Sequence, residues 1–409
     1  MPDPSSPRIG RRISRRGLLG YAGTTGLGAA AGAGLVVAAG GDSPAPAVPG
    51  PQAPGATVSP WGAHQPGVAQ HPPAVTEVVA LDLRDEVDRA ALGRLMRVWT
   101  GDVEALTSGR GAPGDPAPWL SAPAADLTIT VGVGPGALGP ERFGQGPTGF
   151  AEVPPMTHDR LEERWSGGDL CVTVAGRDGT TVAHAVRRLV ADAAPFARAR
   201  WRQVGSWNPT DPSGRPQTGR NLFGQVDGSG NPRPGTELFD STVWIREGRW
   251  AGATTMVLRR IRMDLDTWDE LTRDEQERSV GRRLTDGAPL TGGEELDDLD
   301  LTAESQGRLV VPRDAHSRRS HPSLHGGRRI FRKGANYTRK VDTPRGARVE
   351  SGLLFASYQA DLSDQFVPLQ RSLDELDQLN EWTTAIGSAV FVVLPGFEDG
   401  SWLGESLLA

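Results

Sequence analysis

The segment from residue 170 to residue 204 decides the fold of this chain. It opens with the apolar run Leu170-Cys-Val-Thr-Val174, has helical spacing of apolar residues over 180–193, and ends in a strand-like run over 198–204. An equivalent unit comes before it, with a strand over 76–83, a helix over 85–106 and a strand over 127–133. Two such units in succession predict a ferredoxin-like antiparallel sheet with helices on one face.

The same pattern recurs in the second half of the chain. The periodicity predicts strands and helices in the order strand 253–265, helix 267–280, strand 353–360, helix 369–386 and strand 389–394. Periodicity alone therefore favours an α+β fold with two similar antiparallel sheets. Between the first helix and the second strand of this half lies a polar insertion over 282–350. Insertions of that length in a compact domain are usually functional.

Three motifs carry the candidate chemistry. They are the turn Gly224-Gln-Val-Asp-Gly228, the segment Ala315-His316-Ser-Arg318, and the run Arg329-Ile-Phe-Arg332-Lys-Gly334. One carboxylate, one histidine and one arginine in this order and context resemble the dye-decolorizing peroxidases. The resemblance covers most of the chain from about residue 78 onward. One departure is Gln225, which stands where many relatives have an aromatic residue.

This resemblance implies a haem peroxidase with two ferredoxin-like domains and one haem b per chain, held in the C-terminal half. His316 would be the axial metal ligand, because a neutral imidazole on one side of the iron leaves the other face open to peroxide. Arg332 would stabilise the negative charge on the leaving oxygen as the O–O bond breaks. Asp227 would relay the proton between the two oxygens.

Two further residues are expected to contact or support the cofactor. Gly228 ends the turn, where a missing Cβ lets the backbone approach the macrocycle. Asp361 is the candidate acceptor for the second ring N–H of the histidine, which would make the imidazole more basic. An equal alternative is that Asp361 caps a helix that starts at Leu362.

The expected partners are hydrogen peroxide and small aromatic or dye reductants, with Tyr337 as a candidate electron relay. Because an aspartic acid ordinarily titrates near pH ~4, a carboxylate proton shuttle predicts an acidic optimum. A second hypothesis is an exported haem or iron-handling protein linked to iron uptake, and a third is an exported binding protein without haem. Turnover with peroxide and a dye, together with Soret absorbance, distinguishes the three.

The N-terminus predicts export by the twin-arginine pathway. Ser14-Arg15-Arg16-Gly-Leu-Leu19 precedes a weakly apolar, Gly- and Ala-rich run that extends to residue 39. We expect a signal peptide over 1–45, no stable membrane insertion after its cleavage, and an extracellular or cell-envelope location; a basic disordered tail is the alternative. The composition over 46–75 predicts a flexible linker before an N-terminal domain over 76–235 and a C-terminal domain over 236–409.

Composition restricts the partners further. Removal of residues 1–45 takes away five arginines and two aspartates, which changes the totals from 44 basic and 50 acidic residues to 39 and 48, a net charge of −9. Such a surface repels phosphate backbones, so nucleic acid is not an expected partner. Cys171 is the only cysteine, which excludes a disulfide within the chain and a cluster held by several thiolates. The oligomeric state is left open.

Three other patterns resemble binding motifs but lack the required context. Gly134-Pro-Gly-Ala-Leu-Gly139 matches a dinucleotide fingerprint, yet its prolines leave no long helix to face a pyrophosphate. The oxygen ligands over 227–231 resemble a calcium loop, but Pro232 stands where such a loop needs glycine. His321 and His325 are separated by Pro322, so a solvated loop is expected there, with surface metal binding as the alternative.

Overall fold

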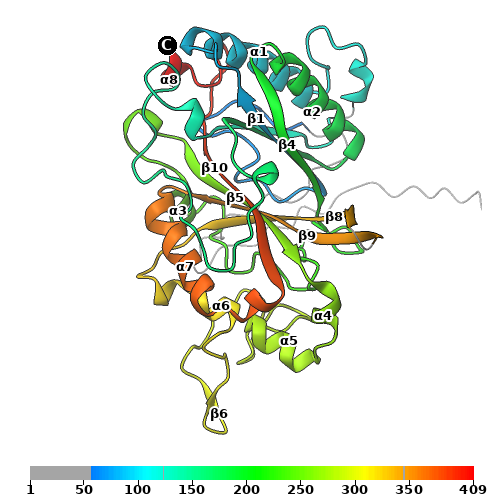
Figure 1. The fold of residues 1–409 in the computed structure, drawn as a ribbon, viewed down its shortest axis with the longest axis vertical. Coiled ribbons are helices and arrows are strands. Elements are labelled where there is room, and N and C mark those ends of the chain that lie inside the picture. The colour runs from blue at the N-terminus through cyan, green and yellow to red at the C-terminus, as the bar shows by residue number, and fades with distance from the viewer. Residues whose placement is uncertain (1–56, 123, 344–345) are drawn as a thin grey trace, which may run out of the picture. The chain divides into compact units, whose positions relative to one another are not determined.

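The computed structural model describes residues 57–122, 124–343 and 346–409, and eight of its strands close into an antiparallel barrel in the order β1-β3-β2-β10-β5-β9-β8-β4 (Figure 1). The predicted signal peptide lies outside the described residues. The barrel strands are β1 (Val75–Leu83), β2 (Thr128–Val133), β3 (Leu170–Gly176), β4 (Ala197–Ser206), β5 (Thr254–Met263), β8 (Phe331–Thr343), β9 (Gly346–Gln359) and β10 (Thr383–Val393). The short strands β6 (Glu304–Ser305) and β7 (Arg308–Leu309) form a separate hairpin.

The helices follow the two-unit plan that the sequence predicts. Those beside the first four strands are α1 (Arg89–Thr107) and α2 (Gly179–Ala193). Those of the second half are α3 (Glu237–Val243), α4 (Leu265–Asp269), α5 (Arg273–Val280), α6 (His316–Arg319), α7 (Val367–Leu376) and α8 (Glu405–Leu408). No helix in the described ranges is long and apolar enough to cross a membrane.

The barrel consists of two four-stranded sheets that meet at both edges. The first has the order β4-β1-β3-β2 and the second β8-β9-β5-β10, and each is the strand order of a ferredoxin-like unit. At one edge β4 pairs with β8 only at Ser206 and Asn336, and at the other β2 pairs with β10 at two residue pairs. The predicted α+β fold with two similar antiparallel sheets is therefore confirmed, with closure of the sheets into one barrel as an addition.

Helices α1 and α2 cover the outer face of the first sheet. Each begins at an aspartate whose side chain accepts a hydrogen bond from the third residue beyond it, Asp88 from Ala91 and Asp178 from Thr181. Trp99 is fully buried between them, and its indole N–H donates to the carbonyl of Leu189 at 3.0 Å. This layer contains the largest apolar core of the molecule.

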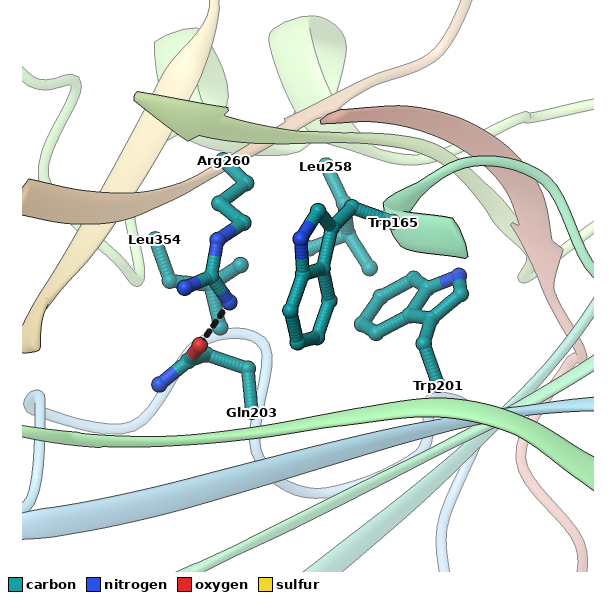
Figure 2. A pocket seen from close by; sticks show the side chains of 6 residues that line it. All are labelled: Trp165, Trp201, Gln203, Leu258, Arg260 and Leu354. Atoms are coloured by element: carbon teal, nitrogen blue, oxygen red, sulfur yellow. Dashed lines mark hydrogen bonds between the residues drawn. The ribbon is translucent and has the colours of Figure 1, made fainter. Parts of the chain in front are cut away.

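The space between the two sheets is filled by side chains, as Figure 2 shows for its centre. The guanidinium of Arg260 lies over the ring of Trp165 at 3.9 Å and over the ring of Tyr337 at 4.2 Å, and it pairs with Glu350. A cavity of about 10 Å³ lies beside Trp165 and Trp201, roughly enough for one water molecule. A cofactor therefore has no room inside this part of the barrel. The same burial raises the pKa of Tyr337 to about 12.

Residues 57–74 fall within the flexible linker that the sequence predicts over 46–75, but the structure shows this segment packed against the barrel. Gln65 lies across the narrow β2–β10 contact, where its amide donates to the carbonyls of Val131 and Leu394. Lys333 on β8 donates to the carbonyls of Gly67 and Gln70. Gln65 and backbone carbonyls make these hydrogen bonds, and such contacts produce no apolar pattern that a sequence reading could detect.

Three predicted elements of the second half also differ. The helix predicted over 267–280 is divided into α4 and α5, because Thr272 caps the start of α5. The polar insertion predicted over 282–350 contains strand β8, whose far end and the start of β9 are exposed and carry polar residues. The helix predicted over 369–386 ends at Leu376, because Asp377 starts a 3-10 turn, η7 (Gln378–Glu381), and residues from Thr383 onward form β10. The boundary between the two domains at residues 235 and 236 stays a prediction.

Candidate functional site

A cavity of about 280 Å³ lies on the outer face of the second sheet, between its strands and the segment that includes α6 and α7. Side chains alternate along a strand, so Ile261 and Met263 of β5 face this cavity while Leu258 and Arg260 face the barrel interior. Leu353 and Phe355 of β9 line the same wall. A wider groove of about 870 Å³ adjoins it, and Asp227, Arg282 and Arg332 line both spaces.

His316 is the first residue of α6 and lines the cavity. Its Nδ1 lies 2.5 Å from Oδ2 of Asp377, and the Asp377 carboxylate also accepts the backbone N–H of Leu379 at 3.0 Å. Among the described residues no hydrogen bond is made to the other ring nitrogen, Nε2. Burial lowers the pKa of His316, but the negative charge of Asp377 and its hydrogen bond outweigh burial and raise it overall. The imidazole is thus fixed through one nitrogen and has the other available.

Asp361 does not support the histidine, which corrects the first of the two roles considered for it. Its carboxylate accepts the backbone N–H of Asp364 at 2.8 Å and caps the π-helical turn η6 (Leu362–Phe366). This is the alternative role, that of a residue ahead of Leu362 that starts a helix. The acid that holds His316 is Asp377, 61 positions along the chain. No local pattern could have identified it, because it lay inside the stretch predicted as helix.

Arg332 and Asp227 come from different elements and meet at the cavity. Arg332 is the second residue of β8, and its Nη2 lies 3.9 Å from Oδ1 of Asp227. Asn221 donates to Oδ2 of Asp227 at 3.3 Å. The structure therefore brings together the carboxylate, the arginine and the histidine that the sequence singled out, all lining one cavity.

The two glycines of the turn allow a backbone conformation that other residues rarely adopt. Gly224 has φ +81° and Gly228 has φ +134°, both in the region that favours glycine. A Cβ at Gly228 would lie 3.0 Å from the Cγ2 of Thr218, whereas one at Gly224 would meet nothing within 4 Å. Backbone conformation thus explains both glycines, and Gly228 also has a close neighbour. Close approach of Gly228 to a cofactor stays a prediction.

Gln225 is a cavity residue whose role the sequence did not suggest. It is 7% exposed, and its Oε1 accepts a hydrogen bond from Asn221 at 2.9 Å. That bond orients the amide, and its buried Nε2 has no partner among the described residues. A buried donor without a partner costs free energy on the order of 1–3 kcal/mol. We therefore expect Gln225 to donate to something that occupies the cavity.

Arg282 is a fixed cation at the boundary between cavity and groove. Its guanidinium donates to the carbonyls of Gly287, Glu295 and Asp297 at 2.9–3.0 Å. These bonds hold the 287–297 loop in place beside the cavity. Burial lowers the pKa of Arg282, with neighbouring acids acting in the opposite direction.

The two other histidines of this region are held by protein groups. His321 Nε2 lies 2.8 Å from Oδ1 of Asp298, and His325 Nε2 lies 2.6 Å from the carbonyl of Arg319. In the described part of the chain, no group of three or more histidine, cysteine or acidic side chains could hold a metal ion. The described residues thus offer no group of metal ligands that includes His321 and His325.

The site at His316 offers one imidazole nitrogen as a ligand, which suits a metal that is already bound by most of its other ligands. One imidazole nitrogen faces a cavity whose walls are largely apolar, with a carboxylate and an arginine close by. An apolar wall suits a flat macrocycle, and a single imidazole suits the one remaining position on its iron. The arrangement can bind a haem and supply a proton relay and a fixed positive charge beside it.

Comparison with known proteins agrees with this geometry. Residues 65–206 match the family model "Dyp-type peroxidase, N-terminal", and residues 218–398 match "Dyp-type peroxidase, C-terminal". The chain is 36% identical to the dye-decolorizing peroxidase of Thermobifida fusca over the whole of both chains. It is 32% identical to a deferrochelatase of Yersinia pseudotuberculosis, covering 85% of this chain and 84% of that protein.

Solved structures are similar over most of the chain. The crystal structure of a DyP-type peroxidase from Cellulomonas bogoriensis has 43% identity and a TM-score of 0.81, and the match covers 87% of this chain and 98% of that one. Ferric DtpA from Streptomyces lividans has 35% identity and a TM-score of 0.81, with 86% and 97% covered.

Proposed function

The chain belongs to the Dyp-type peroxidase family and is a haem peroxidase, and we propose that the cavity beside His316 holds its haem. The observation that carries this proposal is the imidazole of His316, fixed through Nδ1 by Asp377 and available at Nε2. We propose one haem b per chain, bound in the C-terminal half. The apolar side chains of β5, β9 and α7 would enclose the macrocycle.

When bound, a haem would supply the iron at which peroxide is cleaved and the redox chemistry by which the reductant is oxidised. Asp227 takes a proton from one oxygen of hydrogen peroxide and returns it to the other, so that water leaves. Arg332 places a permanent positive charge beside the oxygen on which negative charge develops. Asn221 donates to Asp227 and thereby limits the directions in which the carboxylate points.

The test begins with His316→Ala, which should purify with little haem and without the Soret band. Asp227→Ala and Arg332→Leu should keep the haem but lose peroxide turnover with a model dye. Proton relay by Asp227 also predicts an acidic optimum. The proposed haem site is wrong if His316→Ala retains haem and turnover. The proposed roles of Asp227 and Arg332 are wrong if Asp227→Ala and Arg332→Leu both match the parent in turnover. A peak above neutrality would count against Asp227 as the relay.

The reductants are proposed to be dyes, phenols or similar aromatic donors that reach the groove beside Asp227 and Arg332. The deferrochelatases among the relatives favour a second role, in haem or iron handling, although they match over 85% of the chain and the dye-decolorizing peroxidase matches over all of it. Steady-state turnover with peroxide and a dye separates the roles, because a handling protein would bind haem without rapid turnover.

Export by the twin-arginine pathway to the cell envelope or the medium is likewise a proposal, supported by Ser14-Arg15-Arg16 and the weakly apolar run after it. Replacement of both Arg15 and Arg16 by lysine should leave the protein in the cytoplasm. Unchanged secretion of that variant would contradict the proposal.

A further inference from the structure

The side chain of Asn231 forms two hydrogen bonds with the backbone of Arg332. Its Nδ2 donates to the carbonyl of Arg332 at 2.8 Å, and the N–H of Arg332 donates to its Oδ1 at 3.1 Å. The Nε of Arg332 also lies 3.5 Å from the same Oδ1. The amide thus binds the backbone of Arg332 much as a residue of a neighbouring strand would.

This contact lies where strand β8 lacks a partner strand. On one side β8 pairs with β9 along its whole length, including Arg332 with Ser357. On the other side β4 reaches it only at Asn336. In an antiparallel pair the backbone groups of alternate residues point to the same side, so Arg332 and Asn336 both present N–H and C=O toward the β4 edge. Asn231 provides at Arg332 the pairing that β4 does not provide there.

Asn231 also belongs to the turn that carries Asp227. The backbone N–H of Asn231 donates to the carbonyl of Gly228 at 2.9 Å, which closes the turn directly after Asp227. One side chain therefore connects the backbone on which the carboxylate sits with the backbone on which the guanidinium sits.

Such a connection would set the distance between the carboxylate of Asp227 and the guanidinium of Arg332. Arg332 Nη2 and Asp227 Oδ1 are 3.9 Å apart, too far for a hydrogen bond. Unconstrained arginine and carboxylate side chains often form a two-pronged contact at about 2.7–2.9 Å. In that contact the carboxylate oxygens would be occupied by the arginine and less able to take a proton from peroxide.

We propose that Asn231 is a positioning residue that holds Arg332 and Asp227 at their working separation. This inference rests on the roles proposed above for Asp227 and Arg332. It predicts that the amide of Asn231 matters through the geometry of these two groups, and not through the binding of haem at His316.

The variant to test is Asn231→Ala, with Asn336→Ala as the matched control. Asn336 also lies on β8 and also connects it to the segment before the turn, because its Nδ2 donates to the carbonyl of Arg220 at 2.9 Å. It does so four residues away from Arg332. General loosening of β8 would affect both variants, whereas loss of positioning would affect only Asn231→Ala.

We expect Asn231→Ala to keep its Soret band and to lose on the order of 10- to 100-fold in kcat/KM for peroxide, the effect of a small misplacement of catalytic groups. The acid limb of its pH profile should move to lower pH, because a carboxylate in direct contact with a guanidinium titrates lower. Hydrogen exchange at the amide of Arg332 should become faster, since its acceptor is gone. In the Arg332→Leu background the same substitution should have little further effect.

Equal kinetic losses in Asn231→Ala and Asn336→Ala would overturn the inference, as would an unchanged kcat/KM and pH profile in Asn231→Ala. Full additivity with Arg332→Leu would also overturn it. Failure of the proposed function looks different, because Asp227→Ala and Arg332→Leu would then retain turnover. If those two lose turnover and Asn231→Ala does not, only the positioning role is refuted.

Discussion

Replacement of Asp377 by asparagine should weaken haem binding without unfolding the protein. Asp377 is 7% exposed, and its carboxylate contacts Nδ1 of His316 at 2.5 Å, so the two side chains form a hydrogen bond that involves a charged group. Hydrogen bonds to charged groups contribute about 1.5–3 kcal/mol. Loss of the partner of a metal-binding histidine typically weakens metal affinity about 10- to 100-fold. Asparagine keeps the size of the side chain and removes its charge.

The measurement is titration of haem-free protein with haemin, followed by the Soret band, with Asp361→Asn as the matched control. Asp361 is a carboxylate that caps η6 and does not contact His316, so its replacement should change haem affinity by less than about twofold. Stability should change little, because asparagine caps a helix about as well as aspartate does. The reduction potential should also rise in Asp377→Asn, because a less basic imidazole stabilises ferric iron less. Equal affinities for the two variants, with an unchanged potential, would refute the reasoning.

Three other outcomes are expected. Gln225→Leu should weaken the binding of azide or cyanide to the haem protein several-fold, because Nε2 of Gln225 is a buried donor without a partner; an unchanged dissociation constant would show that it donates elsewhere. Burial, followed by the negative charge of Asp192, raises the pKa of Asp102 from 3.8 to about 7. Protonation of Asp102 should therefore stabilise the fold fully below about pH 4, and this contribution should be lost as the pH rises through 7. Melting temperatures should show this fall in the parent and a smaller one in Asp102→Asn, and equal slopes would contradict it. Gly228→Ala should lower the free energy of unfolding by about 1–3 kcal/mol, because φ is +134° and the new Cβ would lie 3.0 Å from Thr218. Chemical denaturation measures this cost. A cost no larger than that of replacing an ordinary exposed glycine would contradict the prediction.

The fold was largely predictable because its strands and helices are periodic. The apolar runs of β1, β2 and β3, and the helical spacing of α1 and α2, reflect burial on one or both faces. Strand β8 was missed because its pairing is exposed toward its far end, so alternation of apolar and polar residues is weak there. The packed segment over 57–74 was missed because Gln65 and backbone carbonyls hold it.

The candidate site was predictable only where its residues lie in local motifs. Asp227, Arg332 and His316 stand in short stretches that can be recognised one at a time, and the structure brings all three to one cavity. The partner of His316 could not be found in this way, since Asp377 is 61 positions away and meets it only through the packing of α6 against α7. Asp361 was a reasonable candidate by residue type, but its carboxylate is used by the backbone of η6.

The arginines of β5 show why sequence alone could not separate the site from the core. Arg259 and Arg260 are adjacent and both 3% exposed. Their side chains lie on opposite faces of the sheet, because successive residues of a strand alternate between the two faces. Arg259 lines the cavity and pairs with Asp159, whereas Arg260 enters the barrel, pairs with Glu350 and lies over Trp165 (Figure 2). A buried arginine is tolerated only with a partner, and each of these has one. A strand that reads as polar is therefore buried on both faces, and it forms a wall that separates a filled barrel interior from the space that can accept a cofactor.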